Sequence, residues 1–158
     1  MSGKKISELT QVGSVSTQKG FQIQVQKEYA LGLTGLEGFS HVQIVWYADR
    51  APSWENKMLV MPSPYKDAPE MGVFATRSPL RPNGICISNA EVISVDVENG
   101  IIELTWIDAE DGTPVLDIKP YHPSGDKIVN AKIPSWGKSW PKSFEESGDF
   151  DWSKVFLF

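Results

Sequence analysis

The feature that most constrains the fold is a series of short β-prone runs separated by glycine- and proline-containing turns. In residues 21–26, three apolar side chains alternate with three glutamines, as is typical of a half-buried strand. Further strands are expected at residues 10–17, 42–47, 85–87, 89–97, 101–107 and 115–121. Helical windows are too short and too broken for a doubly wound α/β fold. The pattern therefore predicts an all-β barrel or sandwich.

The dipeptide Asn99-Gly100 is the strongest short hairpin signal, because it separates two β-prone runs. A type I′ turn needs positive φ at both central residues, which Asn and Gly tolerate best. On the second strand we expect one face to carry three apolar side chains, those of Ile102, Leu104 and Trp106. Towards the end of residues 42–47, both odd- and even-numbered positions carry apolar side chains, which predicts a strand buried on both faces.

Two stretches lack this regular pattern. Residues 49–70 contain four prolines and are expected to be irregular, with one strand at residues 57–61. A short helix or a turn is expected at residues 28–33, and a short helix at residues 142–147. The tail is rich in aromatic side chains, namely Trp136, Trp140, Phe144, Phe150, Trp152, Phe156 and Phe158.

Such a tail is too aromatic to be disordered. We expect it to lie over the outside of the sheet or across a subunit boundary. The predicted organisation is a single antiparallel barrel domain at residues 1–130 and an irregular, aromatic-rich extension at residues 131–158.

Composition restricts the class of protein and its partners. No apolar run approaches the roughly 20 residues of a membrane span, and no apolar stretch follows the N-terminal lysines as in a secretory signal. A single cysteine excludes an internal disulfide and fits a reducing compartment, so we expect a cytoplasmic protein. Because the net charge is −5, a nucleic acid would need a local patch, for which Arg77, Arg81 and Lys119 are candidates.

Residues 71–88 are the first candidate for a binding site. They begin with a β-prone run at residues 73–76, and they hold two of the three arginines, Arg77 and Arg81, in a proline-stiffened loop. The guanidinium group is a rigid fork of donors that suits a carboxylate, a phosphate or an adenine edge. A tight turn whose arginines pair with surface acids remains the alternative.

Other chemistry has weaker signals. A metal site is not expected, because His41 and His122 lie far apart and outside any ligand-spaced motif. Cys86 lies in an apolar run, where a free cysteine usually behaves as a small hydrophobe. A glycine-rich phosphate loop is absent from the sequence. An arginine loop, an acidic turn and an Asp-Ile-Lys strand together suit a zwitterionic ligand.

Four motifs, in this order, closely resemble the TrmO-like (TsaA-like) family over residues 10–123: Leu36-Glu37-Gly38-Phe39-Ser40-His41, Met71-Gly72-Val73-Phe74-Ala75-Thr76-Arg77-Ser78-Pro79, Arg81-Pro82-Asn83, and the run from Asp111-Gly112-Thr113-Pro114 to Tyr121. The resemblance implies a β-barrel, S-adenosylmethionine-dependent tRNA methyltransferase that acts as a homodimer. Its expected substrate is N6 of the threonylcarbamoyl-adenosine next to the anticodon.

The resemblance also implies roles for particular residues. Cofactor contacts are expected from Tyr47, Ala48, Arg77, Ile87, Thr105, Trp106, Ile107 and Asp108. Catalytic roles are expected for Arg81, Asn83 and Asp111. Substrate contacts are expected from His41, Asp117, Lys119 and Tyr121.

The sequence departs from the family pattern at several places. Gly84 and Cys86 replace the second Pro and the Gly of the usual Arg-Pro-Asn-Pro-Ile-Gly, and two N-terminal segments, Arg-Ser-Pro and Pro-Arg-Gln, are missing. Two alternatives therefore stay open: a noncatalytic module that binds S-adenosylmethionine or a nucleotide, and a methyltransferase for a small molecule.

Overall fold

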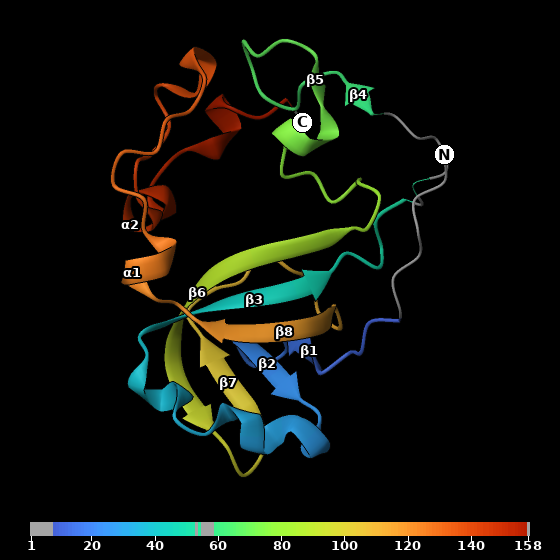
Figure 1. Ribbon diagram of the computed structural model, residues 1–158, viewed down its shortest axis with the longest axis vertical. Helices are drawn as coiled ribbons and strands as arrows, with labels where there is room; N and C mark the ends of the chain where they lie inside the picture. The colour runs from blue at the N-terminus through green and yellow to red at the C-terminus, as the bar shows by residue number, and fades with distance from the viewer. Residues whose placement is uncertain (1–7, 53, 55–58, 158) are drawn as a thin grey trace.

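A closed antiparallel barrel of six strands forms the lower body of the molecule (Figure 1). The computed structural model describes residues 8–52, 54 and 59–157. The barrel strands are β1 (Gly13–Ser16), β2 (Phe21–Val25), β3 (His41–Tyr47), β6 (Ile85–Asp96), β7 (Ile101–Leu104) and β8 (Pro114–Pro120). Their order is β1-β2-β7-β6-β3-β8, and β8 pairs with β1 to close the ring. The all-β prediction is confirmed, and of the two predicted architectures, barrel and sandwich, the structure has the barrel.

The barrel is filled by the inward face of each alternating strand. Ile23, Ile44, Ile102 and Val115 are fully buried there, and each such side chain contributes about 1.5–3 kcal/mol of transfer free energy. The 3₁₀ helices η1 (Lys27–Leu33) and η2 (Leu36–Gly38) cover the lower end and add buried leucines to this core. The helix expected at residues 28–33 is therefore present in 3₁₀ form.

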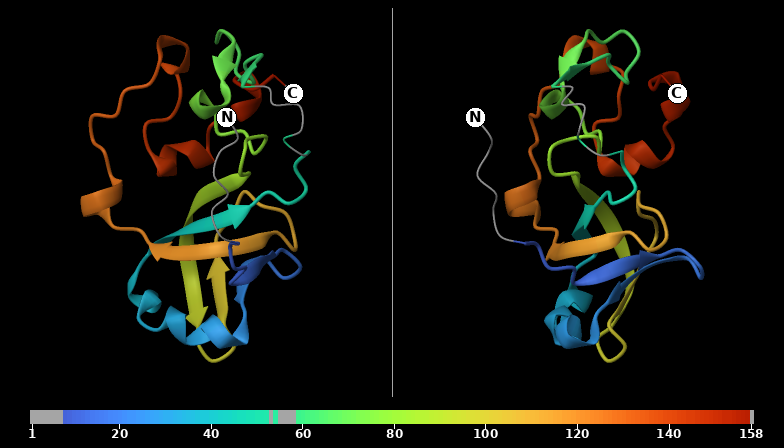
Figure 2. Two further views of the ribbon diagram at one scale, coloured as in Figure 1. Left: turned by 45° about the vertical axis from the view of Figure 1, so that its right-hand side comes forward. Right: turned by 90° about the vertical axis from the view of Figure 1, so that its right-hand side faces the viewer.

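A second, smaller body lies above the barrel (Figures 1 and 2). It contains β4 (Val60–Met61), β5 (Met71–Gly72), η4 (Val73–Ala75), α1 (Pro123–Asp126), η5 (Ser135–Gly137), α2 (Phe144–Gly148) and η6 (Trp152–Lys154). Strands β4 and β5 pair with each other in a separate two-stranded sheet. The predicted helix at residues 142–147 corresponds to α2. The strand expected at residues 57–61 appears as β4, and residues 57 and 58 lie outside the described residues.

Aromatic side chains form the core of this second body. Tyr65, Met71 and Val155 are buried in it, and the partly buried side chains packed around them include Trp136, Trp140, Phe150, Trp152 and Phe156. Within the chain, the tail thus packs mainly on the segment around Tyr65 and not over the sheet. The other expected position, across a subunit boundary, stays a prediction. Phe144 of α2 does reach the barrel, where its ring lies 5.8 Å from that of His41. Phe158 lies outside the described residues, and the division at residue 130 stays a prediction.

Two expectations about strands are wrong. Residues 73–75 form the 3₁₀ helix η4, because the Thr76 amide and hydroxyl both donate to the Val73 carbonyl, at 3.1 and 2.9 Å. In β3, Val42 and Ile44 are fully buried while the alternate residues are partly exposed. The reason is that a closed barrel has one interior, so only one face of each strand reaches the core.

The predicted hairpin between β6 and β7 is confirmed, but its turn is different. Among the described residues, Asp67 is the only non-glycine with positive φ, so Asn99 does not adopt the type I′ conformation. Instead, the Asp96 carboxylate accepts hydrogen bonds from the Asn99 amide and side chain, at 3.0 and 2.7 Å. Of the two central residues Asn99 and Gly100, only Gly100 has positive φ. Because β7 ends at Leu104, Trp106 does not continue the buried face and is half exposed.

Candidate functional site

The arginine-bearing loop, residues 77–84, joins η4 to the start of β6. Its backbone is closed by hydrogen bonds from Arg81 N to Pro79 O, at 2.9 Å, and from Gly84 N to Arg81 O, at 3.2 Å. Two prolines restrict φ in the same stretch. The loop is therefore a stiff support for its two guanidinium groups.

Gly84 explains one of the departures from the family pattern. Its φ is +57°, a conformation that proline cannot adopt, and its amide donates the hydrogen bond that closes the turn. Its carbonyl accepts from Ala48 N at 2.9 Å, which fixes the loop to the end of β3. A Cβ at this position would lie 3.3 Å from the Tyr47 ring. The turn seen here thus requires glycine where the family pattern has proline.

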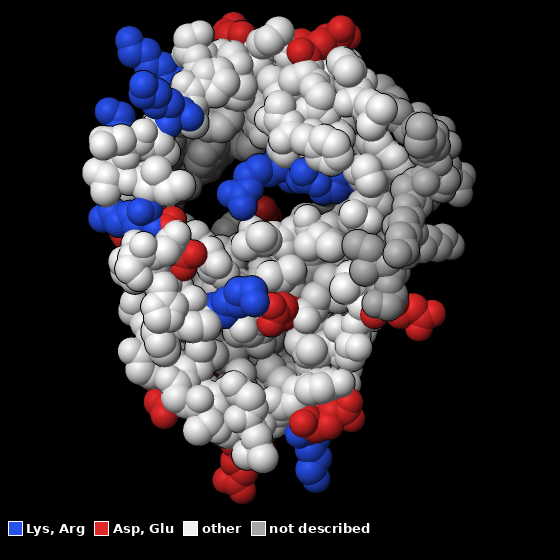
Figure 3. Space-filling model, viewed as in Figure 1, with Lys and Arg blue, Asp and Glu red and all other residues white. Residues whose placement is uncertain are grey.

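The two arginines of this loop are not neutralised by ion pairs within the described part of the chain. The ion pairs there join Arg50 to Glu110, Lys119 to Asp117, and Lys154 to Asp151. Arg77 is exposed and donates from Nη2 to the Ile87 carbonyl at 3.3 Å, and Arg81 is half-buried. Figure 3 shows Lys and Arg side chains at a hollow between the barrel and the upper body. These observations go against the alternative that the arginines simply pair with surface acids.

Cys86, the second residue of β6, shows which charges surround the site. Burial raises the pKa of its thiol, the charges of Arg81 and Arg77 act to lower it, and that of Asp108 acts to raise it. Two cations and one exposed carboxylate therefore lie within electrostatic range of the same strand end. The three groups come from two separate loops, and together they complement a ligand that carries both a carboxylate and an ammonium group.

Large side chains with exposed faces flank these charges. Tyr47, Ile87 and Trp106 are 43%, 49% and 50% exposed. The pairing of β3 with β6 places Tyr47 opposite Ile85, and the Thr105 amide donates to Glu91 O at 3.1 Å, so residues 105–108 begin beside β6. Thr105 is exposed, whereas Ile107 is buried in the barrel core.

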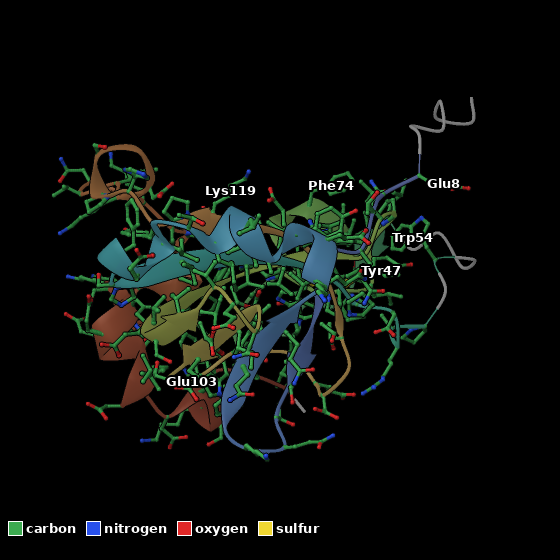
Figure 4. All side chains as sticks on the ribbon, turned by 90° about the horizontal axis from the view of Figure 1, so that it is seen from below. Glu8, Tyr47, Trp54, Phe74, Glu103 and Lys119 are labelled. Carbon is green, nitrogen blue, oxygen red and sulfur yellow. The ribbon has the colours of Figure 1, made fainter. Side chains whose placement is uncertain are left out.

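A shallow pocket of about 70 Å³ opens at this end of the barrel. It is lined by Tyr47, Ala48, Ala51, Pro52, Trp54, Pro79, Arg81, Pro82, Asn83 and Gly84. Figure 4 shows Tyr47 and Trp54 near each other at this end. The sequence analysis did not select Trp54, which lies in the proline-containing irregular stretch where no periodic pattern marks it.

Asp111 lies in the acidic turn that precedes β8. Its Oδ1 accepts a hydrogen bond from Thr17 N at 2.8 Å, and its carbonyl accepts one from Arg50 Nη2 at 2.7 Å. Arg50 also pairs with Glu110, so it clamps this turn to the segment that follows β3. Arg50 was missed by the sequence analysis. The available signal was that the one arginine outside residues 71–88 comes three residues after the end of a strand.

The four residues expected to bind substrate lie along β3, β8 and the residue after β8, in a row that starts at the level of Ile87 and ends at the far end of β3. Asp117 pairs with Val45 and Lys119 with Gln43 across the β3–β8 ladder. Tyr121 N donates to His41 O at 2.9 Å, at the opposite end of β3 from Tyr47.

Two kinds of side-chain contact connect the residues of this row. The Lys119 ammonium lies 2.6 Å from the Asp117 carboxylate, which raises the pKa of Lys119. The His41 ring contacts the rings of Tyr121 and Phe144. The structure therefore brings the expected substrate residues together with one another, but in a row that leads away from Arg81 and Asn83.

The class of this protein follows from these features: it is a closed antiparallel β-barrel protein with an arginine-bearing loop and an exposed carboxylate at one strand end. More specifically, the chain belongs to the family of the tRNA-methyltransferase O N-terminal domain, whose family model matches residues 5–127. The predicted resemblance is thereby confirmed. The aromatic tail lies beyond the matched region.

Relatives agree in sequence and in fold. A probable S-adenosyl-L-methionine-binding protein of Archaeoglobus fulgidus is 38% identical over 122 residues, which is 77% of this chain and 32% of that protein. The human tRNA (adenine(37)-N6)-methyltransferase is 44% identical over 102 residues, 65% of this chain and 22% of the human protein. A crystal structure of TrmO superposes with a TM-score of 0.69 at 28% identity, and the match covers 87% of this chain and 66% of that one.

No helix among the described residues is long and apolar enough to cross a membrane. Within the same residues, no group of three or more His, Cys, Asp and Glu side chains is placed to hold a metal ion.

Proposed function

We propose that this protein is an S-adenosylmethionine-dependent methyltransferase that acts on N6 of an adenosine in tRNA, specifically the threonylcarbamoyl-adenosine next to the anticodon. One observation carries the proposal: Arg77, Arg81 and Asp108 gather around the start of β6 in a chain of this family. The printed names of the relatives support the cofactor and the tRNA substrate. Assembly as a homodimer and a cytoplasmic location belong to the same proposal, and sedimentation would measure the first.

The residues at the strand end fit S-adenosylmethionine by their chemistry. The guanidinium groups of Arg77 and Arg81 would bind its carboxylate, and the exposed Asp108 carboxylate would bind its ammonium group. The exposed faces of Ile87 and Trp106 offer an apolar surface for the adenine ring. A pocket of about 70 Å³ is far below the roughly 300 Å³ or more of a site that encloses such a ligand. Most of the cofactor would therefore lie on the open surface.

When bound, S-adenosylmethionine supplies a methyl group from its sulfonium, which becomes a neutral thioether as the new N–CH₃ bond forms. The adenosine N6 loses one proton in the same exchange. The chain itself contributes orientation, because the stiff loop of residues 77–84 holds its arginines at a fixed place relative to β6. The surrounding side chains are half exposed, so water is available to take the proton.

The test is methyl transfer from labelled cofactor to tRNA from cells that lack the endogenous activity, followed by nucleoside analysis. We expect label in N6-methylated threonylcarbamoyl-adenosine. Arg77→Ala should weaken cofactor binding by at least about tenfold in calorimetry, since a hydrogen bond to a charged group is lost. Lys154→Ala, which removes a cation already paired with Asp151 in the aromatic body, is the control and should bind normally. Equal cofactor affinity of Arg77→Ala and the unchanged protein would contradict the site.

A second candidate is a noncatalytic module that binds S-adenosylmethionine. The observation that favours it is Asp111, a residue expected to be catalytic whose carboxylate is engaged with the Thr17 amide. In that case calorimetry would detect the cofactor, and no tRNA would accept the label. Transfer to a small molecule but not to tRNA would instead support the third alternative, a small-molecule methyltransferase.

A further inference from the structure

The segment between α1 and α2 has a charge that differs from the rest of the chain. Residues 127–142 contain four lysines, Lys127, Lys132, Lys138 and Lys142, and no acidic residue, whereas the whole chain has a net charge of −5. We refer to these residues as the basic segment. It lies almost entirely beyond residue 127, where the match to the family model ends. The charge of this segment is therefore a property of this chain and is not described by the family pattern.

The lysines of the basic segment are open to solvent. All four are exposed, and none takes part in the ion pairs of the described residues. Lys127 lies near an acid: the pKa of Glu145 is lowered by hydrogen bonds from its own backbone and Ser143, and then by the charges of His41 and Lys127. The Lys142 backbone amide donates to the Glu146 carboxylate at 2.9 Å. No ion pair among the described residues involves the ammonium groups of Lys132, Lys138 and Lys142, so these charges remain available to a partner.

The segment is also fixed in place by the second core. The Trp136 ring stacks on Tyr65 with centroids 5.3 Å apart, and the Trp140 ring lies 4.9 Å from that of Tyr65. Lys138 lies between these two tryptophans in sequence, and Lys142 follows the second one. A cation on such a support loses less conformational freedom on binding than one on a loose tail.

The position of the segment relative to the site points to the partner. Figure 3 shows one group of basic side chains on the outer surface of the upper body above α1, and another in the hollow beneath that body, where the arginine loop lies. A polyanion that runs from the hollow over this part of the upper body would meet both groups of cations. A nucleic acid backbone has this repeating negative charge.

We propose that Lys132, Lys138 and Lys142 bind the phosphate backbone of the RNA substrate while its target base lies at the arginine loop. This inference rests on the proposed function, and it assigns to the aromatic body the role of carrying an RNA-binding surface. The contacts are to phosphates, so they supply affinity and position without reading the base sequence.

The experiment compares two triple variants in tRNA binding as a function of salt concentration. The test variant is Lys132→Gln, Lys138→Gln, Lys142→Gln. The control is Lys19→Gln, Lys27→Gln, Lys66→Gln, which removes the same charge at exposed lysines outside the basic segment. We expect the test variant to lower the slope of log K against log[salt] by roughly 2 to 3, because each phosphate contact contributes about 0.7–0.9. The control should change it by less than about 1.

Calorimetry with S-adenosylmethionine separates this inference from the proposed function. The test variant should bind the cofactor as the unchanged protein does, which also shows that it is folded. Normal methyl transfer with an unchanged tRNA salt slope would overturn the inference and leave the proposed function standing. Loss of binding to phosphatidylserine vesicles or of self-association, with tRNA binding intact, would also overturn it. No methyl transfer by the unchanged protein, with a reduced salt slope in the test variant, would overturn the proposed function alone.

Discussion

The barrel and the aromatic body are held together by different kinds of contact. In the barrel, aliphatic side chains such as Ile23, Ile44 and Ile102 fill an interior that is closed by backbone ladders. In the aromatic body, described regular structure is short, and the core depends on rings from distant parts of the sequence, such as Tyr65 and Trp152. The barrel is thus built from a repeated local pattern, and the aromatic body from a few long-range contacts.

This difference separates folding from the arrangement of the site. The arginine loop begins at η4 in the aromatic body and ends at β6 in the barrel. Its geometry therefore depends on both bodies, whereas the barrel strands depend mainly on one another. The following predictions test how far the two bodies are independent, from the largest expected effect to the smallest.

The largest effect is expected in the barrel core. Ile44→Ala removes a fully buried side chain from β3 and leaves a cavity, so the free energy of unfolding should fall by about 3 kcal/mol. Chemical denaturation measures this change. Ile93→Ala, at a 63% exposed position at the bulge of β6, is the control and should change the free energy by less than about 0.5 kcal/mol. Similar losses for the two variants would show that the barrel core is not the main source of stability.

A smaller and more local effect is expected in the aromatic body. Trp140→Ala removes a half-buried ring that contacts three others, those of Tyr65, Trp136 and Trp152. The free energy of local unfolding of the aromatic body should fall by about 2 kcal/mol. Hydrogen exchange should show lost protection around Tyr65 and Val155, with protection of β3 and β6 retained. Phe74→Ala, at an exposed ring, is the control. Equal loss of protection in both bodies would show that they unfold as one unit.

The smallest effect concerns the electrostatics at the strand end. Since burial raises the pKa of the Cys86 thiol, its reaction with a thiol reagent should begin at higher pH in the folded protein than in urea. Ionisation is harder in the folded state, so the free energy of unfolding should decrease as pH rises through the alkaline range.

Two variants move this thiol pKa in opposite directions. Arg81→Gln should raise it further and slow the reaction at fixed pH, because the guanidinium charge favours the thiolate. Asp108→Asn should lower it and speed the reaction. A shift of the same sign in both variants would contradict the presence of both Arg81 and Asp108 within electrostatic range of Cys86.

Much of the barrel could be predicted because its signal is local. The alternation in residues 21–26 fixes which side chains point inward, and a closed barrel has one place for them. The hairpin could be located from Asn99-Gly100, but its turn type could not. The Asp96 carboxylate offers the Asn99 amide and side chain hydrogen bonds that favour another conformation.

The site was predictable in its parts and not in its assembly. The sequence motifs selected Arg77, Arg81 and Asp108, and spatial proximity then grouped them around Cys86. The motifs gave no indication that Arg50 clamps the acidic turn, because that contact joins residues 60 positions apart. Long-range contacts of this kind leave no periodic trace in the sequence.

By itself, the sequence determined the all-β class, the inward face of β2 and the family, because alternation and motif order are properties of neighbouring residues. The tertiary structure decided where the aromatic tail packs, how Gly84 ties the arginine loop to β3, and that the second core holds the basic segment through Trp136 and Trp140. These features depend on distances between segments, which only the folded chain fixes.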